Sequence, residues 1–299
     1  MSSADPTPVP SGASVTRSAS AATLSQSAGG RFPAPGGRCQ TAAVAEPLPF
    51  DRCLAVIDSA ARDLVERAES AGLTAAVPTC PEWSVAELVA HQGMVHRWAT
   101  SHLRHDGADI PGEQEIVATV PGDQLLAWFT EGARDLLVAL RLADPEGPAM
   151  VFLADAPPPV HFWARRQAHE TTVHAVDALA AALGREPTAK EAGVDTEVAL
   201  DGLDELLTGF FPRGRSKLAH LQPLTISVLP SDSDRGWTVH VADDRLTTLR
   251  EPCEKAQATF SGTAAELYLG LWNRGSEVLA TGRPGVLEAW RDRQRIRWG

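Results

Sequence analysis

The chain has 299 residues, of which 43% are hydrophobic and 22% charged, so it is long enough for two domains with buried cores and ordinary for a globular protein. Its formal net charge of -11 argues against a nucleic-acid-binding protein, which would usually present a basic face. No apolar run approaches the roughly 18 residues that would span a bilayer, so we expect no membrane partner.

The cysteines are far apart and form no C-x-x-C pair. They are Cys39, Cys53, Cys80 and Cys253. This spacing predicts neither a disulfide framework nor a thiolate zinc site, and it suits a reducing, cytoplasmic environment.

Residues 1–46 are rich in Ser, Ala, Pro and Gly and lack the apolar segment of a secretory signal, so we predict a disordered tail. Amphipathic helical patterns follow at 49–73, 80–103, 122–144 and 160–184. Ser84 and Glu87 stand in capping-box register at the start of the second helix, and Gly184 ends the fourth. Four long helices predict an antiparallel four-helix bundle, to which we assign residues 47–190.

The pattern changes after a further helical stretch near 196–211. The segments "PLTISVLP" and "GWTVHVADD" alternate like strands, and "QATFSGTAAELYLGLWNRG" predicts a strand, a turn and a helix. The tail "PGVLEAWRDRQRIRW" adds a short helix. We therefore predict a small α+β domain over residues 215–299, which makes the fold class α + (α+β).

The fourth helix contains "FWARRQAHETTVHAVDAL" (162–179), in which a His-Glu pair is followed by a second histidine, as in the metal-binding helix of a zinc protease. The protease motif needs its two histidines four residues apart, and His169 and His174 are five apart. Glu170 and His174, in contrast, are four apart and share one face of the helix. The simpler explanation for Glu170 is a surface salt bridge with Arg166, one turn earlier.

The second helix supplies a histidine on its apolar stripe, His91, whereas His96 falls away from that stripe. A lone core histidine is the plainer interpretation, but a carboxylate facing the same interior must be paired or bind a metal. We therefore predict a divalent metal site, Zn²⁺ or a similar ion, on His91, Glu170 and His174. Asp177 stands three residues after His174 and is placed to orient its ring.

The segments "VPTCPEWSVAELVAHQGMVHRWA" and "FWARRQAHETTVHAVDAL" together resemble the mycothiol-dependent maleylpyruvate isomerase family. That family has a DinB-like four-helix bundle and a C-terminal domain similar to sterol carrier proteins. The resemblance covers most of residues 48–184 and the segment near 256–273, and it carries the family's metal ligands onto the same three residues. Glu82 departs from the pattern, where the family often has glycine.

The resemblance implies a zinc-dependent isomerase or S-transferase with mycothiol as co-substrate, which fits the actinobacterial-looking composition. Its partners would be a small thiol and a small electrophile. The family also draws a substrate-contacting arginine from its C-terminal domain, so Arg274 is the candidate catalytic residue. Arg165 and Arg166 are further candidates, although surface positions explain all three arginines more simply. Cys80 fits a structural cysteine better than a reactive thiol.

Two alternatives from other classes remain. A DinB-like protein can bind a metal without catalysis and act in stress response or regulation. A metallohydrolase would activate water at the same three ligands.

Overall fold

The computed structural model describes residues 47–153, 155–213, 215–243 and 245–294. The tail predicted over residues 1–46 lies outside this part of the chain. Among the described residues, no helix combines the length and apolarity needed to cross a membrane.

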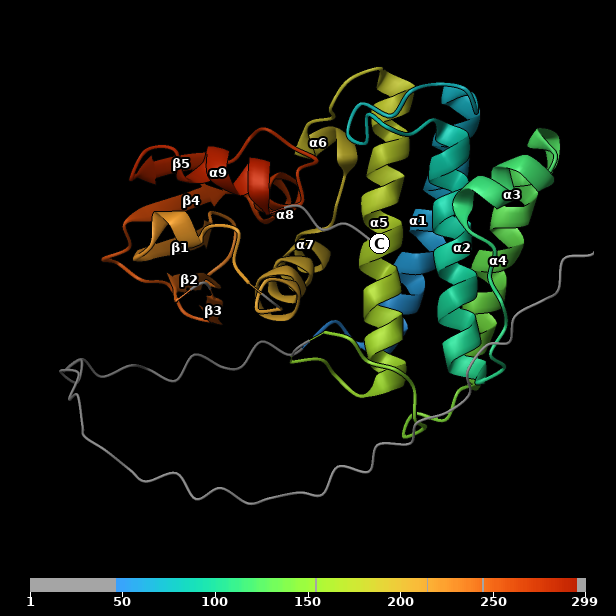
Figure 1. Ribbon diagram of the computed structural model, residues 1–299, viewed down its shortest axis with the longest axis horizontal. Helices are drawn as coiled ribbons and strands as arrows, with labels where there is room; N and C mark the ends of the chain where they lie inside the picture. Colours follow the sequence, from blue (N-terminus) through green and yellow to red (C-terminus); the bar gives the residue numbers. More distant parts are fainter. Residues whose placement is uncertain (1–46, 154, 214, 244, 295–299) are drawn as a thin grey trace, which may run out of the picture. The chain divides into compact units, whose positions relative to one another are not determined.

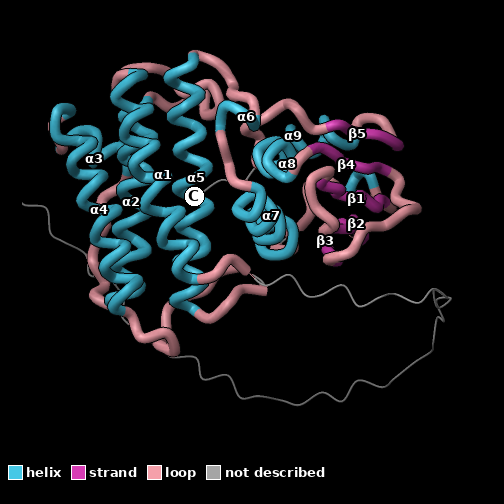
Figure 2. Tube along the Cα trace, turned by 180° about the vertical axis from the view of Figure 1, so that it is seen from behind, coloured by secondary structure: helices cyan, strands magenta, loops and turns pink. Residues whose placement is uncertain are grey.

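Four long helices lie side by side in the N-terminal half (Figures 1 and 2). They are α1 (Phe50–Ala71), α2 (Val85–Arg104), α4 (Gly122–Leu142) and α5 (Pro159–Leu183). Helix α5 packs against α1 and α2, and α4 packs against α2 and α1. All four correspond to the predicted helical patterns, whereas their assignment to the DinB-like class stays a prediction.

The ends of these helices follow local sequence rules. Ser84 and Glu87 form the predicted capping box of α2, with Ser84 N–H donating to Glu87 Oε2 over 2.6 Å. Helix α5 begins with Pro159 in its first turn and ends at Gly184, which adopts the left-handed conformation. The short helix α3 (Glu113–Thr119) was not predicted, and it packs on α2.

Gly93 allows α2 and α4 to approach closely. A Cβ at this position would lie 2.3 Å from Cζ3 of Trp128, which packs over the glycine from α4. Only glycine leaves room for the indole here.

The C-terminal half begins with short helical segments. They are α6 (Ala189–Ala192), α7 (Thr196–Asp204), the π-helical turn η1 (Glu205–Phe210) and the 3₁₀ turn η2 (Ala219–Leu221). The helix predicted near 196–211 is thus observed, but its second half widens into a π-helix.

A mixed sheet follows with strand order β3-β2-β1-β4-β5. Its strands are β1 (Leu224–Pro230), β2 (Trp237–Ala242), β3 (Arg245–Leu249), β4 (Ala258–Gly262) and β5 (Leu279–Gly282). Neighbours pair antiparallel except β1 and β4, which are parallel. Strands β1, β2 and β4 were predicted; the short edge strands β3 and β5, which carry little apolar alternation, were not.

Helix α8 (Ala264–Leu271) packs on β4 and β1, and α9 (Val286–Arg293) follows β5. The α+β character predicted for the C-terminal part is therefore observed. The boundaries at 190 and 215 stay a prediction, as does the similarity to sterol carrier proteins.

Helix α5 is buried on nearly all its faces, unlike a surface helix with one polar side. Helices α1 and α2 cover one side of it, while side chains from α7, η1 and α8 contact the other. The α7–α8 contact is tight, because a Cβ on Gly202 would lie 2.3 Å from Cε2 of Tyr268. The polar residues of α5 consequently find their partners inside the protein.

Candidate metal centre

The structure brings the three predicted ligands together. One donor atom from each of His91, Glu170 and His174 lies within 4.8 Å of the other two. Glu170 Oε1 is 3.3 Å from His174 Nε2 and 4.0 Å from His91 Nε2. All three residues are at most 5% exposed. Two imidazoles and a carboxylate at this spacing are a donor set suited to Zn²⁺ and similar divalent cations.

His91 carries the clearest sign of a missing partner. Both of its ring nitrogens are buried, and neither has a hydrogen-bond partner among the described residues. The nearest carboxylate oxygens are 3.8 Å away on Glu113 and 4.0 Å away on Glu170, which is too long for a hydrogen bond. An imidazole buried without a partner is costly unless something absent from the protein chain binds it.

Trp83 covers the cluster from the segment that precedes α2. Its ring centroid lies 4.7 Å from that of His91 and 5.9 Å from that of His174. Hydrogen bonds from Trp83 N–H to the Cys80 carbonyl and from Val77 N–H to the Trp83 carbonyl fold this segment into a turn. The indole therefore limits access of water to the donor atoms.

Asp177 holds His174 in place from the side away from Glu170. Its Oδ2 lies 2.9 Å from His174 Nδ1, which donates to the carboxylate and leaves Nε2 facing the cluster. Asp177 also accepts a hydrogen bond of 2.6 Å from the Thr79 hydroxyl. This is the orienting role predicted from the three-residue spacing.

Arg274 reaches the same carboxylate from the C-terminal half. Its Nε donates to Asp177 Oδ1 over 3.0 Å and one terminal nitrogen to Oδ2 over 3.1 Å. Asn273 adopts a left-handed conformation just after α8, and Arg274 N–H closes the turn onto the Leu269 carbonyl. Arg274 therefore contacts Asp177, the partner of the predicted ligand His174. Its catalytic role stays a prediction.

Arg166 and Glu170 form the salt bridge predicted from their spacing, but in the interior. The terminal nitrogen Nη2 of Arg166 lies 2.8 Å from Glu170 Oε2, and Nη1 bonds the carboxylate of Glu205 on η1. Arg166 is 1% exposed, so the expectation of a surface position is wrong. The expectation of a surface position is also wrong for Arg165, which pairs with Asp201 on α7. Both arginines are buried because the C-terminal half covers this face of α5.

These ion pairs set the charge of the site. Burial raises the pKa of Glu170, but the Arg166 guanidinium and the neighbouring imidazoles of His174 and His91 together outweigh it and hold that pKa well below its ordinary value. The pKa of Asp177 is likewise raised by burial, but Arg274 and His174 together lower it further than burial raises it. Both carboxylates are therefore ionised at neutral pH, as a metal ligand and its supporting partner must be.

Other residues weighed from the sequence have structural roles. His169 is fully buried and lies 2.7 Å from Asp201, as expected of a core histidine. His96, expected away from the apolar stripe, is also fully buried and contacts Gln92 and Thr171. Burial raises the pKa of Cys80 to about 12, which leaves its thiol protonated at neutral pH.

The residues that sequence analysis missed are the acidic partners of α5. Asp201, Asp204 and Glu205 stand three and four residues apart and share one face of α7 and η1. Within the sequence "LDGLDELL", they are the complement of the Arg165–Arg166 pair. Two adjacent arginines on one amphipathic helix and an acidic face on another were the available signal.

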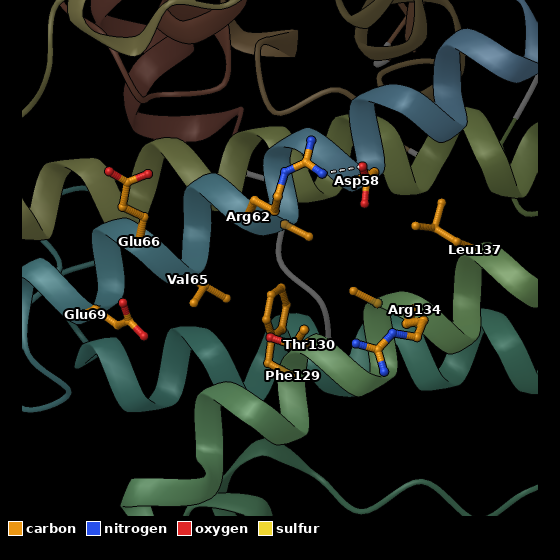
Figure 3. A pocket seen from close by; sticks show the side chains of 11 residues that line it. Asp58, Arg62, Val65, Glu66, Glu69, Phe129, Thr130, Arg134 and Leu137 are labelled. Atoms are coloured by element: carbon orange, nitrogen blue, oxygen red, sulfur yellow. Dashed lines mark hydrogen bonds and ion pairs between the residues drawn. The ribbon is translucent and has the colours of Figure 1, made fainter.

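A cavity of about 320 Å³ lies between α1 and α4 and is lined by none of the predicted ligands. Figure 3 shows its charged rim, with Arg62 paired to Asp58 and with Glu66 and Arg134 beside it. Its lining residues are different from those of the candidate metal centre.

Comparison with known proteins identifies the family of the chain. Two family profiles match the chain: the mycothiol maleylpyruvate isomerase N-terminal domain over residues 54–179 and the corresponding C-terminal domain over residues 197–290. The chain belongs to the mycothiol-dependent maleylpyruvate isomerase family. The first match contains all three donor residues, and the second contains Glu205 and Arg274.

Two solved structures share the fold of this family member. A crystal structure of the mycothiol-dependent maleylpyruvate isomerase aligns with a TM-score of 0.54 at 17% identity, covering 78% of this chain and 93% of that one. A histidine-to-alanine mutant of that enzyme aligns with the same score and coverage at 16% identity. None of the curated proteins compared with the chain matches it.

Proposed function

We propose that this family member is a metal-dependent enzyme whose His91, Glu170 and His174 hold Zn²⁺ or another divalent cation. It uses mycothiol as co-substrate, and it isomerises a small electrophile similar to maleylpyruvate or transfers the thiol to it. The observation that carries this proposal is His91, a buried imidazole with no hydrogen-bond partner among the described residues, beside an ionised carboxylate and a second imidazole.

A zinc ion, when bound, supplies the positive charge that keeps a small thiol ionised as the nucleophilic thiolate. The chain's own residues prepare the site. Asp177 fixes the His174 ring with Nε2 toward the cluster, and Arg166 occupies only Oε2 of Glu170, so that Oε1 faces both histidines. Trp83 covers the site and reduces competition from water.

The same proposal places the enzyme in the cytoplasm, where mycothiol would be kept reduced. Cys53, Cys80 and Cys253 are free thiols in the structure, which supports a reducing compartment.

The test is a thiol-dependence assay on purified protein with maleylpyruvate and a panel of other activated alkenes, epoxides and halides. We expect at least one electrophile to be converted only when mycothiol is present. Hydrolysis without thiol would favour a metallohydrolase, and a metal-loaded protein inactive on the whole panel would favour a non-catalytic metal-binding protein.

A cobalt-substituted sample separates thiol from water chemistry without knowledge of the electrophile. Adding a small thiol should produce a sulfur-to-metal charge-transfer band in the visible and near-ultraviolet spectrum. An unchanged spectrum at saturating thiol would contradict the proposed use of a thiol.

A further inference from the structure

The Arg166 guanidinium is shared between two carboxylates on different parts of the chain. Its Nη2 bonds Glu170 Oε2 from one turn along α5, and its Nη1 bonds Glu205 Oε2 from the π-helical turn η1. Phe210 and Trp272 lie against the guanidinium, with 4.9 Å and 5.5 Å from its carbon to their ring centroids. The group is therefore held firmly between the two acids.

Glu205 has no other visible task. It is 1% exposed, and its Oε1 has no hydrogen-bond partner among the described residues. Its one hydrogen-bonded partner there is Arg166. Burying a carboxylate costs several kcal/mol unless it is paired, so the ion pair with Arg166 is what compensates the burial of Glu205.

Arg166 could bind Glu170 in two ways. Arginine forms its strongest carboxylate contact with two parallel N–H groups on both oxygens, which would draw Glu170 Oε1 away from His91 and His174. In the structure Glu205 binds Nη1, and Nε has no hydrogen-bond partner among the described residues. Nη2 alone therefore contacts Glu170, at Oε2, and Oε1 stays 3.3 Å from His174 Nε2.

We propose that Glu205 is a positioning residue for the metal centre. By binding one terminal nitrogen of Arg166, it keeps Glu170 Oε1 free as a ligand. The C-terminal half thereby influences the metal affinity of a site whose ligands all lie in the N-terminal half. This inference rests on the proposed metal site. Glu205 lies on a π-helical turn, and such turns are frequent at functional sites.

The test compares Glu205→Gln with Asp201→Asn by measuring the dissociation constants of Zn²⁺ and Co²⁺ in competition with a chelator. Both substitutions are nearly isosteric, remove one buried negative charge and lie on the same face of α7 and η1. Asp201 pairs with Arg165 and His169. Among the described residues, neither of these forms a hydrogen bond or ion pair with the side chain of His91, Glu170 or His174, so Asp201→Asn controls for lost stability.

We expect Glu205→Gln to weaken metal binding about tenfold, the lower end of the range for residues that support a ligand, and Asp201→Asn to change it less than about twofold. Equal effects of the two variants, whether both large or both absent, would overturn the inference. The thermal stability of the metal-free proteins is recorded alongside, and both variants are expected to lose stability.

A second variant keeps the test decisive if Glu205→Gln does not fold. Arg166→Lys retains the positive charge, but its ammonium group lacks the rigid planar fork that places one terminal nitrogen on each carboxylate. It should weaken metal binding in the same direction, and an unchanged dissociation constant would count against the inference. If the wild-type protein binds no metal, the proposed function itself fails. If the wild type binds metal but Glu205→Gln binds it as tightly as Asp201→Asn does, the proposed function stands and this inference fails.

Discussion

Asp177 on α5 and Arg274 after α8 are 97 residues apart in sequence and form a two-point ion pair beside His174. Asp177 is fully buried, and its carboxylate binds the imidazole and the guanidinium at once. Through Asp177, a residue of the C-terminal half therefore helps to fix the orientation of His174, a predicted metal ligand.

Replacing Arg274 by lysine should separate a positioning role from direct contact with the substrate. A lysine keeps the charge but loses the two-point contact with Asp177, so we expect metal affinity to fall about tenfold along with kcat. Asp177→Asn should have the same effect. A rise in KM with unchanged metal affinity and kcat would instead identify Arg274 as a substrate-binding residue.

Gly202→Ala should destabilise the protein although alanine is the better helix former. The new Cβ would lie 2.3 Å from the Tyr268 ring, and overpacking of this kind costs about 1–3 kcal/mol. Gly122→Ala on α4 is the control, because the nearest atom to its Cβ would be 3.6 Å away, an ordinary contact. Urea unfolding should show a loss for the first and little change or a gain for the second; a gain for Gly202→Ala would refute the close packing of α7 on α8.

Cys80 should react slowly with alkylating reagents in the metal-free protein near pH 7.5. Burial, assisted by the charge of Asp177, raises the pKa of its thiol to about 12, so little thiolate is present. Site-resolved mass spectrometry after iodoacetamide treatment measures this directly. Alkylation of Cys80 as fast as that of a free cysteine derivative would show that the thiol is activated.

His96 should make the metal-free protein less stable in mild acid. Burial lowers its pKa from 6.5 to about 3, so the folded state excludes a proton that the unfolded state takes up. This contribution is complete above pH 6.5 and is lost as the pH falls toward 3, by up to about 1.4 kcal/mol per pH unit. In His96→Asn, the free energy of unfolding should depend less steeply on pH between 5 and 6.5; identical slopes would mean that His96 titrates normally.

The sequence was enough to predict that His91, Glu170 and His174 lie close together, because helical spacing and capping are local. The capping box at Ser84 fixes the start of α2 and hence the face on which His91 lies. The four-residue spacing of Glu170 and His174 gives their common face in the same way. Neither inference needs knowledge of the rest of the fold.

What lies against the second side of α5 could not be predicted in this way. Arg165 and Arg166 resemble surface residues until α7 and η1 cover them, and that packing depends on long-range contacts between helices. The pairing of Arg274 with Asp177 depends equally on how α8 docks, which no spacing within one helix reveals.

The same contacts bear on the division of the chain into domains. A chain that ended near residue 190 would retain all three ligands but would leave Arg165 and Arg166 without Asp201 and Glu205. The truncation would uncover this side of α5 and remove Glu205 and Arg274, which bind Arg166 and Asp177 beside the predicted ligands, so we expect such a chain to lose stability and metal affinity together.

The central claim is that His91, Glu170 and His174 hold a divalent metal, and elemental analysis of purified protein tests it most directly. The account predicts about one zinc or similar ion per chain in the wild type, nearly none in His174→Ala, and full content in His96→Ala, which removes a buried histidine outside the donor set. Equal metal content in the wild type and His174→Ala, or none in the wild type after incubation with Zn²⁺, would contradict it.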